Sequence, residues 1–346
     1  MNYEQTLAKL TRLLADQYSQ AELILKAEMA MKIKKIKQQR NAVILGHNYM
    51  EPALFHTVPD FTGDSLGLSR QAAKTDKDVI VFCGVEFMAE TAKILSPEKT
   101  VLCPSQKAGC SLAESITAED IRQLKKQFPG VPVVTYINSY AEVKAETDIC
   151  CTSGNAKEVV ESLKSDAVIF LPDEYLAGNV AKETGKHIIF PSKNKGKNKI
   201  NNNNLDVQMI GWHGKCEVHD QFTVEDIENA RATFPDVVVL AHPECKPEVV
   251  DASDFSGSTT EIIKYIRNNN LQKYLLLTEC AMGDNIQAEN PNREMLRMCA
   301  VRCPYMNQIQ LKDTYNALKY NQYEITIPED IRLRAYKSVE RMLQIG

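Results

Sequence analysis

The chain has 346 residues, of which 44% are hydrophobic and 25% are charged, the composition of an ordinary soluble globular protein. Its formal net charge of −4 argues against a nucleic-acid partner, because proteins that bind nucleic acids usually carry a basic patch. The N-terminus lacks the apolar core of a signal peptide, and no run approaches the roughly 18 apolar residues of a membrane span. We therefore expect a cytoplasmic protein without a membrane partner.

Residues 1–40 combine apolar residues at helical spacing with charges throughout, which predicts an N-terminal helical arm packed on the outside. From residue 41 onward, short β-branched runs alternate with helical segments such as NAKEVVESLKS and TTEIIKYIRNN. Continuous apolar strands that alternate with helices are typical of parallel sheets covered on both faces. Residues 304–346 contain two further helical patterns, and we expect them to fold back on the first part of this α/β region.

Three segments of the chain repeat one pattern, and each copy ends in a cysteine. A lead strand ends in polar residues, an acidic-hydrophobic step leads into a Ser/Gly turn, a second apolar strand follows, and the cysteine comes last. From turn serine to cysteine the spacing is 45 residues in the first copy (Ser65 to Cys110), 45 in the third (Ser258 to Cys303) and 63 in the second. The excess in the second copy coincides with a lysine- and asparagine-rich stretch at 193–204, which is typical of a surface insertion.

This repetition predicts a pseudo-threefold α/β protein whose units pack together, because no linker rich in Pro, Gly or Ser separates them. We assign 41–112 with 304–346 to the first unit, 113–217 to the second and 218–303 to the third. In open α/β sheets, ligands bind beyond the carboxyl ends of the strands. If the units face each other, the polar residues at the ends of the lead strands converge on one active site at the common interface. These residues are His47, Tyr49, Tyr136, Asn138, His242 and Glu244.

Ten cysteines in a large chain that we expect to be cytoplasmic indicate metal or redox chemistry rather than disulfides. Cys110, Cys216 and Cys303 hold equivalent positions in turn-like contexts, which favours a shared metal site over three buried apolar thiols. Zinc usually recruits close pairs such as Cys-x-x-Cys, which this chain lacks. Three thiolates would leave one iron of a [4Fe–4S] cluster without a protein ligand, and such an iron can act as a Lewis acid. We expect the cysteines in or beside apolar strands and turns to be structural: Cys83, Cys103, Cys150, Cys151, Cys245 and Cys280.

In their order and spacing, these motifs closely resemble those of the quinolinate synthase family. The matching stretches are GHNY (46–49), GDSLGLSR (63–70), FCGVEFMAETAKILSPEKTVL (82–102), AGCS (108–111), TYINS (135–139), CTSGNA (151–156), GKCEVH (214–219), HPEC (242–245), GST (257–259) and CPYM (303–306). The resemblance implies three related α/β/α sandwich domains that each supply one cluster ligand, namely Cys110, Cys216 and Cys303. Cys303 is preferred over Cys299 because its Cys-Pro-Tyr-Met context is that of the family.

The resemblance also implies a reaction. A transferase of NAD biosynthesis would condense iminoaspartate with dihydroxyacetone phosphate to quinolinate, with loss of phosphate and two waters. The open iron of one [4Fe–4S] cluster per chain would act as a Lewis acid in the dehydration. A transient contact with L-aspartate oxidase and the choice between monomer and homodimer stay open. On the residues alone, two other classes also stay open: an iron–sulfur hydro-lyase of another kind and a cluster-binding sensor.

Substrates with two carboxylates and a phosphate require a site that holds several anions. Ser65, Ser153 and Ser258 each open a helical stretch, where free backbone N–H groups and the helix dipole favour anions. Thr259 would assist Ser258. For each serine, the alternative is a plain N-cap.

The candidates for proton transfer during enolisation and dehydration are His47, Tyr49 and Glu244. His47 and Tyr49 share one strand end, and Glu244 is the best candidate for a carboxylate acid or base. His219 follows the expected ligand Cys216 by three residues, so we expect it to face the cluster pocket and hold a substrate carboxylate. The remaining candidates for substrate binding are Tyr136, Asn138 and His242.

Overall fold

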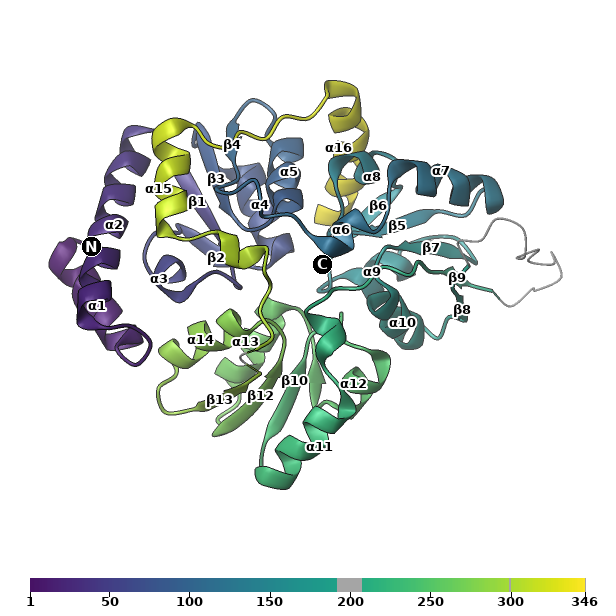
Figure 1. Ribbon diagram of the computed structural model, residues 1–346. Coiled ribbons are helices and arrows are strands. Elements are labelled where there is room, and N and C mark those ends of the chain that lie inside the picture. The colour runs from purple at the N-terminus through teal and green to yellow at the C-terminus, as the bar shows by residue number, and fades with distance from the viewer. Residues whose placement is uncertain (192–206, 299, 346) are drawn as a thin grey trace.

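The computed structural model describes residues 1–191, 207–298 and 300–345. The predicted insertion at 193–204 and Cys299 lie outside these residues. Three separate parallel sheets, each flanked by helices, surround a common centre (Figure 1). The predicted α/β class with short parallel sheets is therefore confirmed.

The N-terminal segment forms two helices, α1 (Tyr3–Leu14) and α2 (Gln20–Gln39), which pack against each other. Asn2 and Ser19 start them with reciprocal capping boxes, in which cap side chain and third helical residue each satisfy a free backbone N–H. Along both helices the buried residues recur at helical spacing, so one face packs inward and the charged face meets solvent.

The first sheet has the strand order β2 (Phe61–Gly63), β1 (Ala42–His47), β3 (Val79–Cys83) and β4 (Thr100–Leu102). All six residues of β1 are buried, as expected for a parallel strand covered on both faces. Its helices are α3 (Pro52–Phe55), α4 (Ser65–Lys74), α5 (Glu86–Leu95) and α6 (Ser111–Glu114).

The third sheet repeats this order with β11 (Phe255–Ser256), β10 (Val238–Ala241), β12 (Lys273–Leu277) and β13 (Glu294–Arg297). The middle sheet begins in the same way with β6 (Ile149–Cys151), β5 (Val133–Tyr136) and β7 (Val168–Leu171). It then adds β9 (Met209–Ile210) and, at the edge, β8 (Ile188–Ile189). The shared order is the structural counterpart of the sequence repeat.

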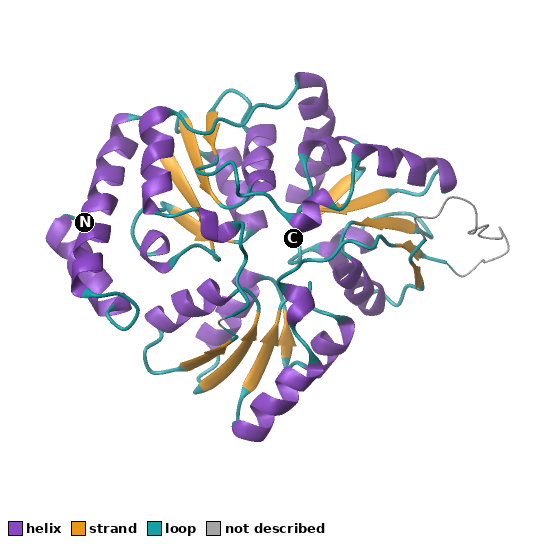
Figure 2. Cartoon of the chain, in the orientation of Figure 1, coloured by secondary structure: helices purple, strands orange, loops and turns teal. Residues whose placement is uncertain are grey.

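Helices connect the strands of these two sheets. In the middle part of the chain they are α7 (Ala118–Gln127), α8 (Ala141–Ala145), α9 (Ala156–Glu161) and α10 (Glu174–Glu183). In the third part they are η1 (His219–Gln221), α11 (Val224–Thr233), α12 (Pro247–Ala252), α13 (Thr259–Asn268) and α14 (Cys280–Glu289). The carboxyl ends of the lead strands face the centre of the molecule (Figure 2).

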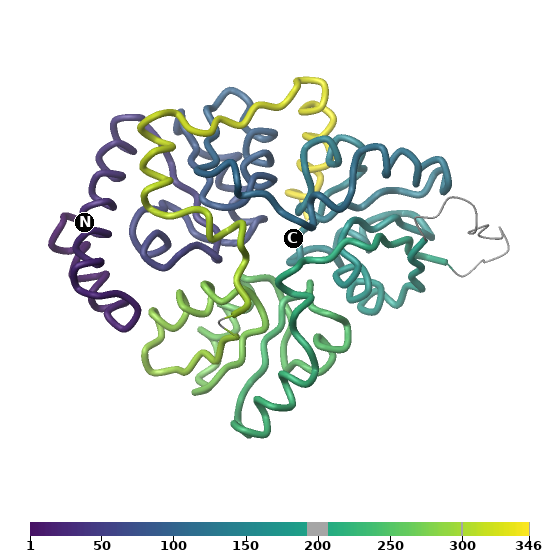
Figure 3. The backbone as a smooth tube through the Cα atoms, in the orientation of Figure 1, coloured from purple at the N-terminus to yellow at the C-terminus, as the bar shows by residue number. Residues whose placement is uncertain are grey.

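The C-terminal segment contains η2 (Met306–Gln308), α15 (Leu311–Tyr320) and α16 (Glu329–Leu343). α15 packs on α2 and β3, whereas α16 packs on α8 and β6 as well as on α5, so it joins the first and second units. The described part of the chain ends near the centre (Figure 3), where the buried Asn155 side chain donates a 2.9 Å hydrogen bond to the Ile345 carbonyl. Within the described residues, no helix combines the length and the apolar character that crossing a membrane would need.

Candidate active site

A cavity lies where the three units meet, and its atom-free volume is about 690 Å³, including the part open to solvent. The structure brings almost all of the predicted site residues to its wall. Those that line it are His47, Tyr49, Ser65, Cys110, Tyr136, Asn138, Ser153, Cys216, His219, His242, Glu244, Thr259 and Cys303. Ser258 is the predicted residue that is not among them.

The three predicted cluster cysteines share one local structure. The carbonyls of Cys110, Cys216 and Cys303 each accept a hydrogen bond from the backbone N–H four residues later, at 3.0, 2.9 and 3.1 Å. Each cysteine therefore opens a single helical turn. Each sulfur also accepts hydrogen bonds from the backbone N–H groups two and three residues later. These groups stabilise negative charge on sulfur, which is the environment that a metal-bound thiolate needs.

The same three cysteines differ from the others in exposure. Cys110, Cys216 and Cys303 are half-buried, whereas the six remaining cysteines of the described part of the chain are buried. Burial raises the pKa of the Cys110 thiol to about 12 and that of Cys303 to about 11, although the backbone N–H groups partly oppose this. A nearby positive charge is therefore required before these thiols ionise at neutral pH, and metal ions supply such a charge.

Glu244 lies in a buried carboxylate–imidazole group that spans the second and third units. Its Oε2 is 3.1 Å from Nδ1 of His219 and 3.2 Å from Nδ1 of His242. The Asn138 side-chain amide donates to Oε1 at 3.2 Å. Burial would raise the pKa of Glu244, but the neighbouring His219, together with His242, outweighs burial and holds the pKa below its usual range. Glu244 is therefore a carboxylate at neutral pH.

His47 and His242 occupy equivalent places in the first and third units and make the same local contact. Nδ1 of each accepts the backbone N–H two residues later, of Tyr49 at 3.2 Å and of Glu244 at 3.3 Å. Burial lowers the pKa of His47 to about 4, so its imidazole is neutral at neutral pH. Because Nδ1 accepts, the proton of neutral His47 is on Nε2, which makes this nitrogen a hydrogen-bond donor.

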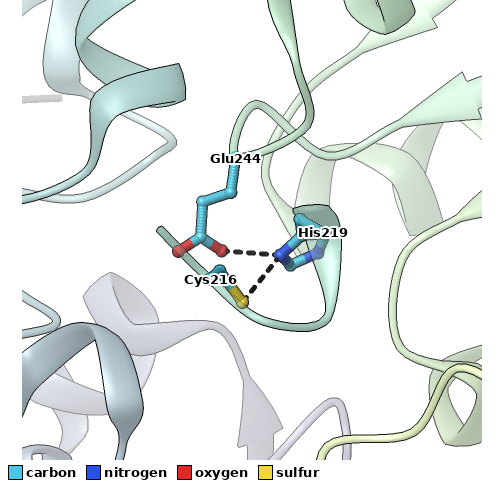
Figure 4. A group of neighbouring side chains, drawn as sticks. All are labelled: Cys216, His219 and Glu244. Carbon is cyan, nitrogen blue, oxygen red and sulfur yellow. Dashed lines mark hydrogen bonds and ion pairs between the residues drawn. The ribbon is translucent and has the colours of Figure 1, made fainter. Parts of the chain in front are cut away.

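A chain of side-chain contacts connects Tyr49 of the first unit to Glu244 of the third. The Tyr49 hydroxyl is 2.6 Å from Oγ1 of Thr278, and this oxygen is 3.1 Å from Nε2 of His219. Nδ1 of His219 then faces Glu244, as Figure 4 shows. With neutral His219, protons can be placed along the whole chain so that Tyr49 donates to Thr278, Thr278 to His219 and His219 to Glu244. The arrangement is a continuous hydrogen-bonded path across the site.

The family described as "NadA: Quinolinate synthetase A protein" matches residues 31–344. The chain belongs to the quinolinate synthetase A family. It is 52% identical over 313 residues to "Quinolinate synthase 2" of Mesorhizobium japonicum, covering 90% of each chain. It is 53% identical over 313 residues to "Quinolinate synthase" of Agrobacterium fabrum, covering 90% of this chain and 84% of the relative. A protein of that name from Xylella fastidiosa is 51% identical over 313 residues, covering 90% and 86%.

In this member of the quinolinate synthetase A family, the three turn serines have different positions. Ser65 is the first residue of α4, whose N-cap is Asp64, and it lines the cavity. Ser153 precedes the start of α9, and its Oγ is 3.4 Å from Nε2 of His242. Ser258 is the N-cap of α13, with its hydroxyl 3.4 Å from both the Glu261 N–H and Oδ2 of Asp64.

Thr259, the residue after Ser258, lines the cavity in its place. Its Oγ1 accepts a 2.9 Å hydrogen bond from the Asn48 side-chain amide of the first unit. The contact holds the start of α13 against the end of β1. The helix start therefore faces the cavity through Thr259 rather than through its capping serine.

The sequence analysis did not identify two buried polar residues close to the site, Thr278 and Asp173. Thr278 directly follows β12, and Asp173 follows the equivalent strand β7 by two residues. Both are buried polar residues at the carboxyl end of a second strand, which was the available signal. Asp173 caps α10 by accepting the Leu176 N–H at 2.6 Å, while burial and the charge of Glu244 raise its pKa well above the usual range.

Proposed function

We propose that the chain condenses iminoaspartate with dihydroxyacetone phosphate to give quinolinate, phosphate and two waters, as a step of NAD biosynthesis. Atoms balance in this equation without an oxidant or reductant. The names of the relatives support the assignment. The observation that carries it is the convergence of Cys110, Cys216 and Cys303 on one cavity that also contains the Glu244 carboxylate and its two histidines.

The three cysteines would hold three irons of one [4Fe–4S] cluster. The donor set fits this group, since three half-buried thiols each receive two backbone N–H groups and open on the same space. When bound, the cluster would supply a Lewis-acidic iron without a protein ligand to assist loss of a substrate hydroxyl. The remaining chemistry falls to the side chains around it.

Substrate anions would bind at the starts of α4 and α13. Both helices have ten residues, and Ser65 and Thr259 bring their first turns to the cavity wall. Free N–H groups and the helix dipole there favour phosphate or carboxylate. Oδ1 of Asn138 is buried and has no hydrogen-bond partner among the described residues, so it would accept an N–H or O–H of the bound substrate.

Proton transfers would be divided between the ends of the Tyr49–Thr278–His219–Glu244 chain. Glu244, held as a carboxylate by its histidines, would accept a proton from the substrate. Burial raises the pKa of Tyr49 well above its usual range, so its hydroxyl keeps its proton and would turn from Thr278 to donate to a developing oxygen anion. His47, neutral with its proton on Nε2, would donate a second hydrogen bond.

The test is an anaerobic assay of the reconstituted protein with iminoaspartate and dihydroxyacetone phosphate. We expect a brown protein that releases quinolinate and phosphate in equal amounts, whereas the cluster-free chain releases neither. Reconstituted protein that dehydrates other hydroxy acids but forms no quinolinate would establish the hydro-lyase alternative. A protein that binds iron but turns over no substrate would support the remaining alternative, a cluster-binding sensor.

A further inference from the structure

Cys216, His219 and Glu244 form a group that resembles the ligand set of a single metal ion. One ligand atom of each lies within 4.8 Å of those of the other two, and among the described residues this is the one group of three His, Cys, Asp or Glu for which that holds. We propose that the cluster-free protein binds one Zn²⁺ ion at this place. This ligand set shares Cys216 with the three-cysteine cluster, but its other two ligands are not cysteines.

Two of the three distances between the ligand atoms suit a tetrahedral ion, and the third is within 4.8 Å. Nδ1 of His219 is 3.2 Å from Sγ of Cys216 and 3.1 Å from Oε2 of Glu244, and Figure 4 shows the two contacts meeting at this nitrogen. Ligand atoms of tetrahedral zinc lie about 3–4 Å apart, given Zn–N, Zn–O and Zn–S bonds of about 2.0–2.3 Å. An ion placed among the three atoms would replace the proton that His219 now shares with its neighbours.

The backbone holds two of the ligands in one turn. Cys216 lies three residues before His219, the first residue of η1, and the Asp220 N–H closes this turn on the Cys216 carbonyl at 2.9 Å. A Cys-x-x-His pair has the close spacing that zinc sites use, although the chain lacks the Cys-x-x-Cys pair sought in the sequence. Glu244 completes the set from the loop after β10.

Neighbouring side chains fix the orientation of these ligands. Thr278 contacts Nε2 of His219 at 3.1 Å, which directs Nδ1 toward Cys216 and Glu244. Asn138 donates to Oε1 of Glu244, which leaves Oε2 for an ion. Such outer contacts set the tautomer and direction of metal ligands.

Charge and ligand type both favour zinc. One thiolate and one carboxylate would neutralise a divalent cation in a place where His219 and Glu244 are 1% and 3% exposed. Mg²⁺ and Ca²⁺ prefer oxygen ligands alone, whereas sulfur with imidazole selects Zn²⁺ and similar ions. Three protein ligands leave a fourth position toward the cavity, as in zinc sites that keep a water.

Zinc at this site and the proposed cluster exclude each other, because Cys216 cannot serve both. Cys110 and Cys303, in contrast, belong to the cluster set only. The exclusion rests on the proposed function, whereas zinc binding does not. A zinc-loaded chain should therefore take up iron and sulfide only after a chelator removes the zinc.

The experiment titrates Zn²⁺ into the full-length, cluster-free chain by calorimetry, with Mg²⁺ as the negative control. We expect one Zn²⁺ per chain and no binding of Mg²⁺. His219→Gln, Glu244→Gln and Cys216→Ser should each abolish tight binding, while Thr278→Val should weaken it by roughly 10- to 100-fold. Co²⁺ gives a second readout, since a thiolate charge-transfer band should form in the parent and vanish in Cys216→Ser.

Cys110→Ser is the matched control, because it removes a cluster thiol but no ligand of the single ion. It should bind Zn²⁺ and Co²⁺ like the parent and form no cluster. Parental Zn²⁺ affinity in His219→Gln or Glu244→Gln would overturn the site, and so would loss of binding in Cys110→Ser, which would place the ion on the thiols. Zinc binding by a chain that forms no cluster would contradict the proposed cofactor alone, and cluster formation without zinc binding would contradict this inference alone.

Discussion

Thr278 shows how one hydroxyl can order two functional groups. It contacts the Tyr49 hydroxyl at 2.6 Å and Nε2 of His219 at 3.1 Å, and it is 3% exposed. Replacing it by Val keeps the shape of the side chain but removes the hydrogen-bond partner of the half-buried Tyr49 hydroxyl and of the buried Nε2 of His219. An unsatisfied buried group of this kind costs about 1–3 kcal/mol and is relieved by rotation of the ring or hydroxyl.

We therefore predict that Thr278→Val lowers kcat by roughly 100-fold while iron content stays at the parental level. Steady-state kinetics on cluster-replete protein measures the effect. Thr278→Ser restores the hydroxyl and should recover most of the rate. A serine variant as slow as the valine variant would show that Thr278 acts through packing instead.

His56 predicts a dependence of stability on pH away from the active site. Burial and the charge of Lys9 lower the pKa of this histidine to about 4 in the folded chain, against 6.5 ordinarily. Between these two values the unfolded chain binds a proton that the folded chain does not. The free energy of unfolding therefore falls as pH decreases from about 6.5 to about 4, and the full loss persists below that.

Replacing His56 by Gln should remove this contribution. Urea denaturation at about pH 7.5 and about pH 5 should show the parent losing about 2 kcal/mol more than His56→Gln over that interval. Since burial lowers the pKa of His47 in the same way, both proteins should still lose stability in acid. Parallel pH profiles for parent and variant would contradict the prediction.

At the scale of elements, the starts of α4 and α13 separate ligand binding from helix capping. Ser65 lines the cavity at the start of α4, whereas Ser258 caps α13 and is 3% exposed. Ser65→Ala should therefore raise KM by roughly 10- to 100-fold through loss of a hydrogen bond to a charged substrate group. Ser258→Ala should instead lower the free energy of unfolding by about 1 kcal/mol with a much smaller change in KM.

Kinetics and urea denaturation on the two variants distinguish these effects. Thr259→Ala offers a comparison at the same helix, since Thr259 does line the cavity. If Ser258→Ala raised KM as much as Ser65→Ala, Ser258 would bind a substrate anion as well as cap its helix. The separation of capping from ligand binding would then be wrong.

Sequence predicted the sheets well because each lead strand is an apolar run that only a covered parallel sheet can bury. The six buried residues of β1 illustrate this. The packing partners of α16 could not be predicted in the same way. Its amphipathic pattern indicates that one face is buried, but not which unit covers that face. It packs on α8 and β6 as well as on α5.

At the scale of the whole molecule, the sequence repeat predicts the residues that recur in each unit but not the contacts that form between units. Equivalent residues such as His47 and His242 could be found by aligning the copies, and they do make equivalent contacts. Thr278 breaks the pattern, since it joins Tyr49 of the first unit to His219, the first residue of η1. Contacts between units depend on how the units pack, and no periodicity within one copy encodes that.

Cys110, Cys216 and Cys303 line one cavity from three different units, which leads to a prediction about the unfolding temperature of the whole chain. A group that binds the folded chain but not the unfolded chain stabilises it in proportion to the logarithm of its affinity. Because Cys110, Cys216 and Cys303 come from three different parts of the chain, a cluster bound to all three should raise the unfolding temperature of the whole molecule. Calorimetry on anaerobically reconstituted and cluster-free protein should show one transition that shifts upward by several degrees.

The shift should disappear in Cys110→Ser, Cys216→Ser and Cys303→Ser, because two remaining thiols no longer join all units. Cys83→Ala is the matched control, since this thiol is buried in β3 beside Thr314 and away from the cavity wall. It should lose some stability by truncation yet keep the full increase on reconstitution. An increase that survives in Cys303→Ser would show that the third unit is held by side chains alone, and the three-thiol cluster would have to be abandoned.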